Sequence, residues 1–228
     1  MNPEDPVYAV GIGPGNLSFL TPRGERAIQE ASVIVGFETV VDFVRERTDA
    51  DLLTCGYDNE SETLDAFAKR AEAGEKSVAV LMGDPNFSGY QFVGKVQSAV
   101  DRPVRIIPGI SSLQIAASRA RTPMEETVFV TLHKSGDIDS ELDRIRERVG
   151  DYHLLVLPRP FDWMPGDIAA HLLESGARPT LDTFVLERLT HDDEEHTQKD
   201  LGELATHAES GRNDSPFSDL SVLVVRKG

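Results

Sequence analysis

Three short segments of this 228-residue chain place glycine, proline and small polar residues directly after apolar runs, as ligand-binding loops do. The first, VYAVGIGPGN (7–16), carries Gly11, Gly13 and Gly15 at alternate positions. Glycine lets a ligand approach the backbone closely, and Pro14 restricts the loop. This segment therefore indicates either a loop that binds a flat ligand or a tight turn that binds none.

The spacing of these glycines does not suit a phosphate group. A dinucleotide-binding turn has the pattern G-x-G-x-x-G, and its helix begins at the glycines so that the helix N-terminus faces the pyrophosphate. Here Asn16 stands in the place of the third glycine, and Thr21 with Pro22 predicts a helix that begins only after residue 21. The pattern G-x-x-x-x-G-K-[ST] of phosphate-binding loops is absent from the sequence. We therefore do not expect this loop to bind phosphate.

Two further loops of similar composition follow later apolar runs. LMGDPNFSGY (81–90) contains Asp84, which can accept hydrogen bonds, and IPGISSLQIAA (107–117) offers Ser111 or Ser112 as the cap of a helix. If the preceding strands are parallel, all three loops leave the sheet at its carboxyl edge, where open α/β sheets bind their ligands. The three loops together predict a pocket.

The first half of the chain alternates buried β-branched runs with helical patterns. This alternation is typical of a mostly parallel sheet that helices cover on both faces. We assign residues 1–120 to this first α/β domain. The expected strands are 7–13, 32–36, 51–55, 77–82 and 104–109, and the expected helices lie near 22–31, 38–47, 61–73, 87–100 and 111–120.

A second α/β domain is expected at 127–228, after a linker in RARTPMEET (119–127). The segment ESGRNDSPFSD (209–219) is interpreted as a flexible surface loop of this domain. The predicted fold class is therefore α/β with two domains. Its expected second-half elements are strands at 128–133, 153–158, 180–190 and 220–228, helices near 138–149 and 164–174, and an amphipathic stretch near 200–209.

The charge balance excludes several classes of partner. The chain has 39 Asp and Glu against 23 Lys and Arg, a net charge of −16, and only six of its cations are Lys. Such an acidic surface repels nucleic acid and anionic membranes, because both require basic patches. We interpret the composition as that of a protein from a salt-rich cytoplasm, as in a halophilic archaeon, in preference to that of an ordinarily acidic protein.

Other features narrow the site chemistry and the location. The apolar runs are shorter than the roughly 20 residues of a membrane span, and MNPEDP (1–6) lacks the pattern of a signal peptide, so a cytoplasmic protein is expected. Cys55 is the one cysteine, which leaves no internal disulfide and no cysteine-based zinc site. HDDEEH (191–196) offers histidines and carboxylates to a metal, but we interpret it as a solvated acidic loop. His153 and His171 are interpreted as packing or surface residues.

Three ordered motifs carry a resemblance to a known family. GIGPGNLSFLTPRGERAI, GDPNFSGY and PGISSLQIAASRA, in this order and spacing, resemble the S-adenosylmethionine-dependent tetrapyrrole (corrin and porphyrin) methyltransferases. The resemblance spans nearly the whole chain. It implies that the loops hold S-adenosylmethionine, a cofactor without phosphate, in a cleft between two α/β domains, and that the chain forms a homodimer. The implied cofactor contacts are Gly11, Ile12, Gly13, Pro14, Gly83, Asp84, Phe87, Ser111, Ser112, Leu157 and Leu189.

Within that family, two segments resemble one subgroup. PGISSLQIAASR followed by a strand that ends in LH (132–133), and LERLTHDDEEHTQKDLGEL (186–204), are similar to the enzymes that methylate C5 of cobalt-precorrin-7 or precorrin-7 in cobalamin synthesis. Lys134 and Ser135 replace the Gly-Arg that usually follows this histidine, which leaves the substrate contacts open. The catalytic group that takes the C5 proton, and the presence of cobalt in the substrate, also stay open.

The expected substrate is a corrinoid precursor that carries many carboxylates, so an acidic enzyme needs local cations near it. For His133, a functional and a structural role are both open. The alternatives to the C5 reaction are another tetrapyrrole C-methylation, methylation of elongation factor 2 as by diphthine synthase, and a non-enzymatic sensor of an adenosine ligand. Transient contact with neighbouring enzymes of the cobalamin pathway is a further expected partnership. The candidate substrate residues are His133, Lys134, Arg159 and Arg188.

Overall fold

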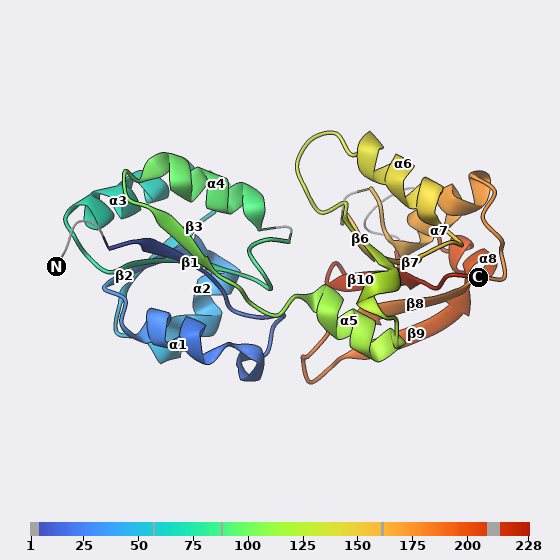
Figure 1. Cartoon of the computed structure of the whole chain (residues 1–228), viewed down its shortest axis with the longest axis horizontal. Coiled ribbons are helices and arrows are strands. Elements are labelled where there is room, and N and C mark those ends of the chain that lie inside the picture. The colour runs from blue at the N-terminus through green and yellow to red at the C-terminus, as the bar shows by residue number, and fades with distance from the viewer. Residues whose placement is uncertain (1–4, 57, 88, 161, 209–214) are drawn as a thin grey trace. The chain divides into compact units, whose positions relative to one another are not determined.

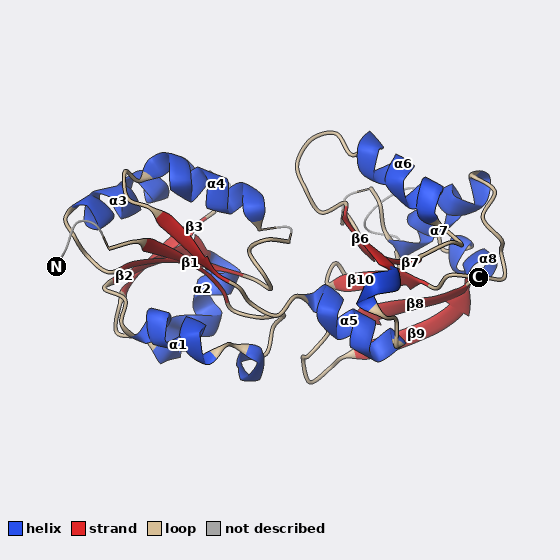
Figure 2. Ribbon diagram, viewed as in Figure 1, coloured by secondary structure: helices blue, strands red, loops and turns tan. Residues whose placement is uncertain are grey.

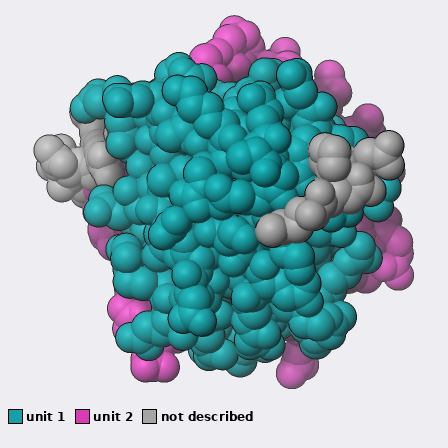
Figure 3. Space-filling model, turned by 90° about the vertical axis from the view of Figure 1, so that its left-hand side faces the viewer, with its two compact units in different colours: residues 1–111 teal, residues 112–228 magenta. Residues whose placement is uncertain are grey.

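The computed structural model describes residues 5–56, 58–87, 89–160, 162–208 and 215–228 of the chain. It consists of two compact units, Met1–Ser111 and Ser112–Gly228, which Figure 3 distinguishes by colour. Each unit is built around one five-stranded sheet. None of the helices in the described ranges is long and apolar enough to cross a membrane.

The sheet of the first unit is entirely parallel. Its strand order is β3-β2-β4-β1-β5, and the five strands expected in this half of the sequence are all present. β1, β2 and β4 are buried almost throughout, as strands are when helices cover both faces. The strands are β1 (Val7–Gly11), β2 (Val33–Phe37), β3 (Asp51–Cys55), β4 (Ser77–Leu81) and β5 (Val104–Ile107).

Helices cover both faces of this sheet (Figure 1). They are α1 (Pro22–Gln29), α2 (Glu38–Val44), α3 (Glu60–Glu72) and α4 (Tyr90–Ala99). Ile28 of α1 and Val41 of α2 join one apolar core with the strands. Phe67 of α3 and Val93 of α4 join the core on the opposite face. The first unit is therefore a three-layer α/β structure, as expected from its sequence.

The connections that leave β1 and β4 run in opposite directions along the sheet. The chain passes from β1 to β2 on one side, and from β4 to β5 on the far side of β1. In open α/β sheets, the crevice at the carboxyl ends of two such neighbouring strands binds the ligand. The strand order thus points to the loops that follow β1 and β4.

The second unit contains a mixed sheet with the order β6-β7-β10-β8-β9. β6 is parallel to β7, and β10 is antiparallel to both β7 and β8. β6, β7 and β8 therefore run in the same direction, and their carboxyl ends lie at one edge of the sheet. The strands are β6 (Thr127–Thr131), β7 (His153–Leu157), β8 (Asp182–Glu187), β9 (Glu195–Asp200) and β10 (Ser221–Val225).

Helices cover both faces of this second sheet as well (Figures 1 and 2). They are α5 (Ser112–Ala120), α6 (Asp139–Arg148), α7 (Pro165–Glu174) and α8 (Leu201–Ala205). Ile145 of α6, Ile168 of α7 and Leu204 of α8 share one apolar core with the strands. α5 packs on the other face, against β7 and β10.

The division of the chain lies earlier than the linker expected at 119–127. α5 was expected to close the first domain, but it belongs to the second unit. The reason is its apolar side, where Leu113, Ala116 and Ala117 are buried and the helix packs on β7 and β10. The boundary consequently falls inside the third glycine-containing loop.

One strand was not expected from the sequence. β9 occupies Glu195–Asp200, part of a stretch interpreted as an acidic loop followed by an amphipathic segment. Its sequence EHTQKD has no apolar alternation, because β9 lies at the edge of the sheet, where among the described residues it pairs with β8. Charged side chains are common on edge strands, since they oppose pairing with other chains. In the loop expected at 209–219, residues 209–214 lie outside the described residues.

Candidate active site

The loops that follow β1 and β4 are joined backbone to backbone. The amide of Gly83 donates to the carbonyl of Gly13 at 2.7 Å, and the amide of Gly13 donates to the carbonyl of Gly83 at 3.4 Å. The amide of Ile12 donates to the carbonyl of Leu81 at 2.9 Å. Gly13 and Gly83 both have positive φ angles, 93° and 66°, which glycine adopts without strain. Two of the three expected loops therefore meet at the topological switch point.

The third loop packs into the same cluster of glycines. A Cβ atom on Gly11 would stand 2.5 Å from the carbonyl oxygen of Gly83 and 2.6 Å from the amide nitrogen of Gly109. These glycines are therefore required for contact between the loops themselves. At Gly83 the space is open, because a Cβ there would find Ser111 Cα at 3.8 Å as its nearest neighbour. The predicted convergence of the three loops is present in the first unit.

The remaining residues of these loops shape the backbone. Asp84 Oδ1 accepts hydrogen bonds from the amide of Asn86 at 2.7 Å and from its Nδ2 at 2.8 Å. The amide of Phe87 donates to the carbonyl of Asp84 at 3.0 Å, and Phe87 is half-buried. Ser111 is buried and directly precedes α5, which begins at Ser112. Asp84 thus holds its own loop in a turn.

The helix after the first loop begins where the sequence predicted. Asn16 caps a short 3₁₀ turn, Leu17–Phe19, and the side chain of Thr21 accepts from the amide of Gly24 at 3.1 Å to cap α1. Pro22 is the first residue of α1. The N-terminus of α1 is therefore separated from the glycines by a turn of its own, which does not suit a phosphate on those glycines.

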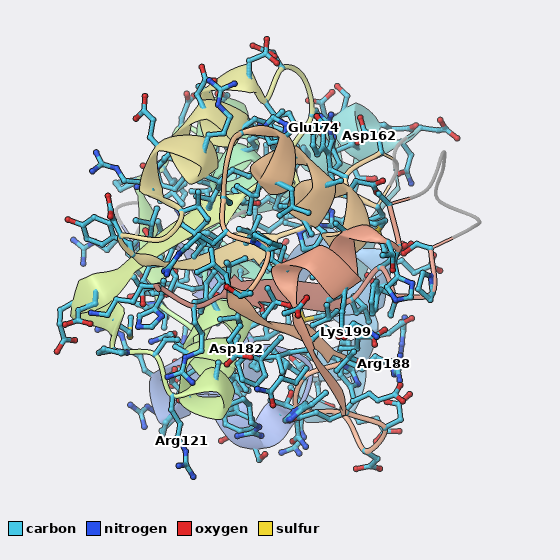
Figure 4. All side chains as sticks on the ribbon, turned by 90° about the vertical axis from the view of Figure 1, so that its right-hand side faces the viewer. Arg121, Asp162, Glu174, Asp182, Arg188 and Lys199 are labelled. Carbon is cyan, nitrogen blue, oxygen red and sulfur yellow. The ribbon has the colours of Figure 1, made fainter. Side chains whose placement is uncertain are left out.

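In the second unit, the candidate substrate residues and two candidate cofactor residues lie at the carboxyl edge of β6, β7 and β8. His133 and Lys134 follow β6, Leu157 ends β7 and Arg159 comes two positions later. Arg188 and the buried Leu189 follow β8 (Figure 4). The direction of the strands thus brings these sequence-predicted residues to one edge.

Each of the three cations at this edge is paired with a nearby carboxylate. Lys134 Nζ lies 2.7 Å from Glu141, and this hydrogen bond lowers the pKa of the Glu141 carboxyl. Arg159 binds Asp162 through Nε at 2.6 Å and Nη2 at 2.7 Å. An Arg has five N–H donors and a Lys has three, so each side chain keeps donors beyond those used in these pairs.

Arg188 makes the most extensive set of ion pairs among these cations. Its Nε lies 2.7 Å from Asp193, and its Nη2 lies 3.1 Å from Glu195. Arg159 also donates from Nη1 to the carbonyl of Gly136 at 3.0 Å, which joins the loops that follow β6 and β7. The cations are thus held in place by local acceptors.

His133 is exposed as a residue, yet the surrounding protein lowers its pKa by desolvation. The negative charge of Asp219 acts in the opposite direction and raises this pKa. Because the ordinary pKa of His is about 6.5, a lowered value leaves the ring neutral at pH 7. A neutral imidazole can accept a proton or a hydrogen bond.

Comparison with known proteins identifies the family. Residues 6–205 match the family model of the tetrapyrrole (corrin/porphyrin) methylases. This chain belongs to that family. The methylase is 29% identical over 223 residues to the probable cobalt-precorrin-7 C(5)-methyltransferase of Methanocaldococcus jannaschii, and the match covers 96% of each chain.

Two solved structures share the fold of this methylase. The precorrin-6Y methylase of Archaeoglobus fulgidus superposes with a TM-score of 0.69 at 20% identity, over 98% of both chains. The uroporphyrin-III C-methyltransferase of Thermus thermophilus, in complex with S-adenosylhomocysteine, superposes with a TM-score of 0.72 at 22% identity, over 97% of this chain and 92% of that one. Tetrapyrrole methylases use S-adenosylmethionine, so this methylase is an S-adenosylmethionine-dependent methyltransferase.

The geometry of the first unit fits this cofactor. S-adenosylmethionine has no phosphate, and the glycine loops of this methylase stand apart from the N-terminus of α1. The open side of Gly83 lies at the switch point, where a flat adenosine can approach the backbone.

Sequence reasoning missed the conformation of the turn after β8. Arg188 and Thr190 have φ angles of 46° and 73°, in the left-handed region that β-branched residues rarely adopt. Glu194, in the segment interpreted as a solvated acidic loop, accepts hydrogen bonds from Arg119, from the amide of Thr190 and from His196. The sequence carries no local signal for these contacts, because Arg119 lies on α5, far away in the chain. In the described ranges no group of His, Cys, Asp and Glu could hold a metal ion.

Proposed function

We propose that this methylase transfers one methyl group from S-adenosylmethionine to C5 of cobalt-precorrin-7, or precorrin-7, in cobalamin biosynthesis. The observation that carries this proposal is the full-length similarity to the Methanocaldococcus jannaschii protein. The shared fold supports the enzyme class and does not choose among tetrapyrrole acceptors.

We propose that the cofactor contacts come from both units. The backbone around the Gly13–Gly83 pair receives the flat part of the cofactor, because Gly83 is open on one side. The cofactor, when bound, supplies an electrophilic sulfonium methyl group, so the protein has to align the acceptor carbon and exclude water. The proposed contacts are Gly11, Ile12, Gly13, Pro14, Gly83, Asp84, Phe87, Ser111, Ser112, Leu157 and Leu189.

We propose that the corrinoid carboxylates are bound at the carboxyl edge of β6, β7 and β8. Lys134, Arg159 and Arg188 keep N–H donors beyond those used by their acidic partners, so each can bind a substrate carboxylate without leaving its pair. His133 follows β6 at the same edge, and its lowered pKa keeps the ring neutral at pH 7, so it can accept a hydrogen bond or a proton from the substrate.

The test is methyl transfer with the purified enzyme. The precursor should gain the mass of a single methyl group, and isotope labelling should place that group at C5. Lys134→Ala, Arg159→Ala and Arg188→Ala should each lower turnover while the affinity for S-adenosylhomocysteine stays unchanged. Lys227→Ala is the matched control, because Lys227 also pairs with a carboxylate, Glu126, but follows β10 at the opposite edge of the sheet.

Other acceptors would give distinct results. Methylation of a pyrrole carbon such as C2 or C20, or of elongation factor 2, would replace the C5 assignment and leave the methylase family unchanged.

We further propose a homodimer in a salt-rich cytoplasm, with transient contacts to neighbouring enzymes of the pathway. Light scattering in high salt should give about twice the 25.0 kDa of one chain, and a mass near 25.0 kDa would contradict the dimer.

A further inference from the structure

The turn after β8 is strained on both sides of Leu189. Arg188 and Thr190 both have positive φ angles, and Leu189 between them is 4% exposed. A non-glycine residue in this region is strained, and Thr, which is β-branched, is particularly disfavoured there. Such a turn persists only where its surroundings hold it in place.

One carboxylate, that of Glu194, forms hydrogen bonds that stabilise this turn. Glu194 Oε2 accepts from the amide of Thr190 at 2.7 Å. Its Oε1 accepts from Arg119 Nε at 2.7 Å and lies 2.7 Å from His196 Nε2. The Glu194 side chain is 17% exposed, whereas its partners Arg119 and His196 are 39% and 43% exposed. Glu194 therefore fixes the backbone at the end of the strained turn.

The same carboxylate ties the turn to α5. Arg119 lies in the last turn of this helix, and its Nη2 also lies 3.3 Å from Glu194 Oε2. The first residue of α5 is Ser112, a proposed cofactor contact, and the turn carries Leu189, another one. Glu194 thus connects two segments of the second unit that are proposed to contact the cofactor.

We propose that Glu194 is a positioning residue for the cofactor site: it holds the left-handed turn Arg188–Thr190 against α5, so that Leu189 is presented to S-adenosylmethionine. The inference rests on the proposed cofactor contacts. Glu194 acts through the turn and through Arg119, and it needs no contact of its own with the cofactor or the substrate.

The experiment measures S-adenosylhomocysteine affinity by calorimetry together with hydrogen exchange at the Thr190 amide. Glu194→Ala should weaken binding at least ten-fold and accelerate exchange at Thr190, because the amide loses its acceptor and the strain is released. Glu194→Gln keeps an acceptor oxygen and should retain most of the affinity. Glu126→Ala is the control, since Glu126 also forms an ion pair in the second unit, with Lys227, and should leave both readouts unchanged.

A double variant separates positioning from general destabilisation. Thr190→Gly in the Glu194→Ala background should recover affinity, because glycine adopts a positive φ without strain. Equal affinity of Glu194→Ala and the wild type would overturn the inference and leave the proposed function standing. Failure of the double variant to recover affinity would also overturn it. A wild-type chain that binds no S-adenosylhomocysteine would instead contradict the proposed cofactor contacts, and this inference with them.

Discussion

The carbonyl oxygen of Gly83 occupies the space that a Cβ atom on Gly109 would need. The same carbonyl accepts a hydrogen bond from Gly13, so a shift of Gly83 would disturb all three loops at the carboxyl edge of the first sheet. Gly83 and Gly109 therefore couple the stability of the first unit to the shape of its three glycine-containing loops, the proposed cofactor site.

Gly109→Ala should destabilise the chain by about 1–3 kcal/mol, the usual cost of overpacking, and should abolish binding of S-adenosylhomocysteine. Urea unfolding and calorimetry provide the two measurements. Gly56→Ala is the control, because Gly56 also follows a strand of this sheet and a Cβ there would meet only Asn59 Oδ1, at 3.5 Å. A Gly109→Ala variant as stable as the wild type would contradict this prediction and would show that the loops can move apart at little cost.

Gly74 and Gly94 should respond to alanine in opposite directions. A Cβ would meet no atom within 4 Å at either position, so packing does not distinguish them. Gly74 follows α3 with a φ of 86°, and Gly74→Ala should cost about 1 kcal/mol of backbone strain. Gly94 lies inside α4, where Gly94→Ala should stabilise by roughly 0.5–1 kcal/mol. Thermal unfolding of both variants tests the signs, and a shared direction would contradict the assigned backbone conformations.

Glu194 should contribute to stability in a pH-dependent way. The hydrogen bond from Arg119 is the largest cause that lowers the pKa of this carboxyl to about 2, and the Thr190 amide and His196 lower it further. In the folded chain the pKa of Glu194 lies below its ordinary value of 4.5. The contribution of this carboxylate to the free energy of unfolding is therefore complete above about pH 4.5 and is lost as the pH falls toward 2. Because Arg119 is partly exposed, we expect about 1–2 kcal/mol.

Urea unfolding of the wild type and of Glu194→Gln, from pH 7 to pH 2, measures this contribution. The difference between their unfolding free energies should be constant at neutral pH and should shrink below pH 4.5. A difference that stays constant down to pH 2 would show that Glu194 is not held as a carboxylate in the folded chain.

The excess of carboxylates should make stability depend on salt. The net charge is −16, and the repulsion among the carboxylates of the folded chain is strongest at low ionic strength. Between 0.1 M and 1 M salt the screening length falls from about 10 Å to about 3 Å, so the unfolding temperature should rise. Calorimetric scans at increasing potassium chloride concentrations measure this unfolding temperature. Neutralising the exposed carboxylates Glu62, Asp65 and Glu72 of α3 should weaken this dependence, and an unfolding temperature independent of salt would remove the argument for a salt-rich cytoplasm.

The parts of the fold that could be predicted are those with a local pattern. The strands of the first unit are buried apolar runs, and Thr21 with Pro22 marks the start of α1 through a side-chain cap and a fixed φ angle. β9 has no such pattern, since an edge strand is defined by its partner β8. The sequence of α5 shows a helix that follows a strand, as in the rest of the first half, and it does not indicate which sheet the helix packs on. The packing of α5 on β7 and β10 assigns it to the second unit.

The site shows the same distinction. The carboxyl ends of parallel strands meet by geometry, so the convergence of the glycine loops follows from the strand pattern. The ion pairs of Arg159 with Asp162 and of Arg188 with Glu195 depend on side-chain reach within folded loops. The left-handed Thr190 goes against the preference of its residue type and is stabilised by Glu194, a contact visible only in three dimensions.

The chain passes from its first unit to its second only once, between Ser111 and Ser112. This crossing lies inside the third of the glycine-containing loops, so a single peptide is both a proposed part of the ligand site and the covalent joint of the molecule. A break in the backbone at this peptide would therefore separate the two units and interrupt the proposed ligand loop in a single step.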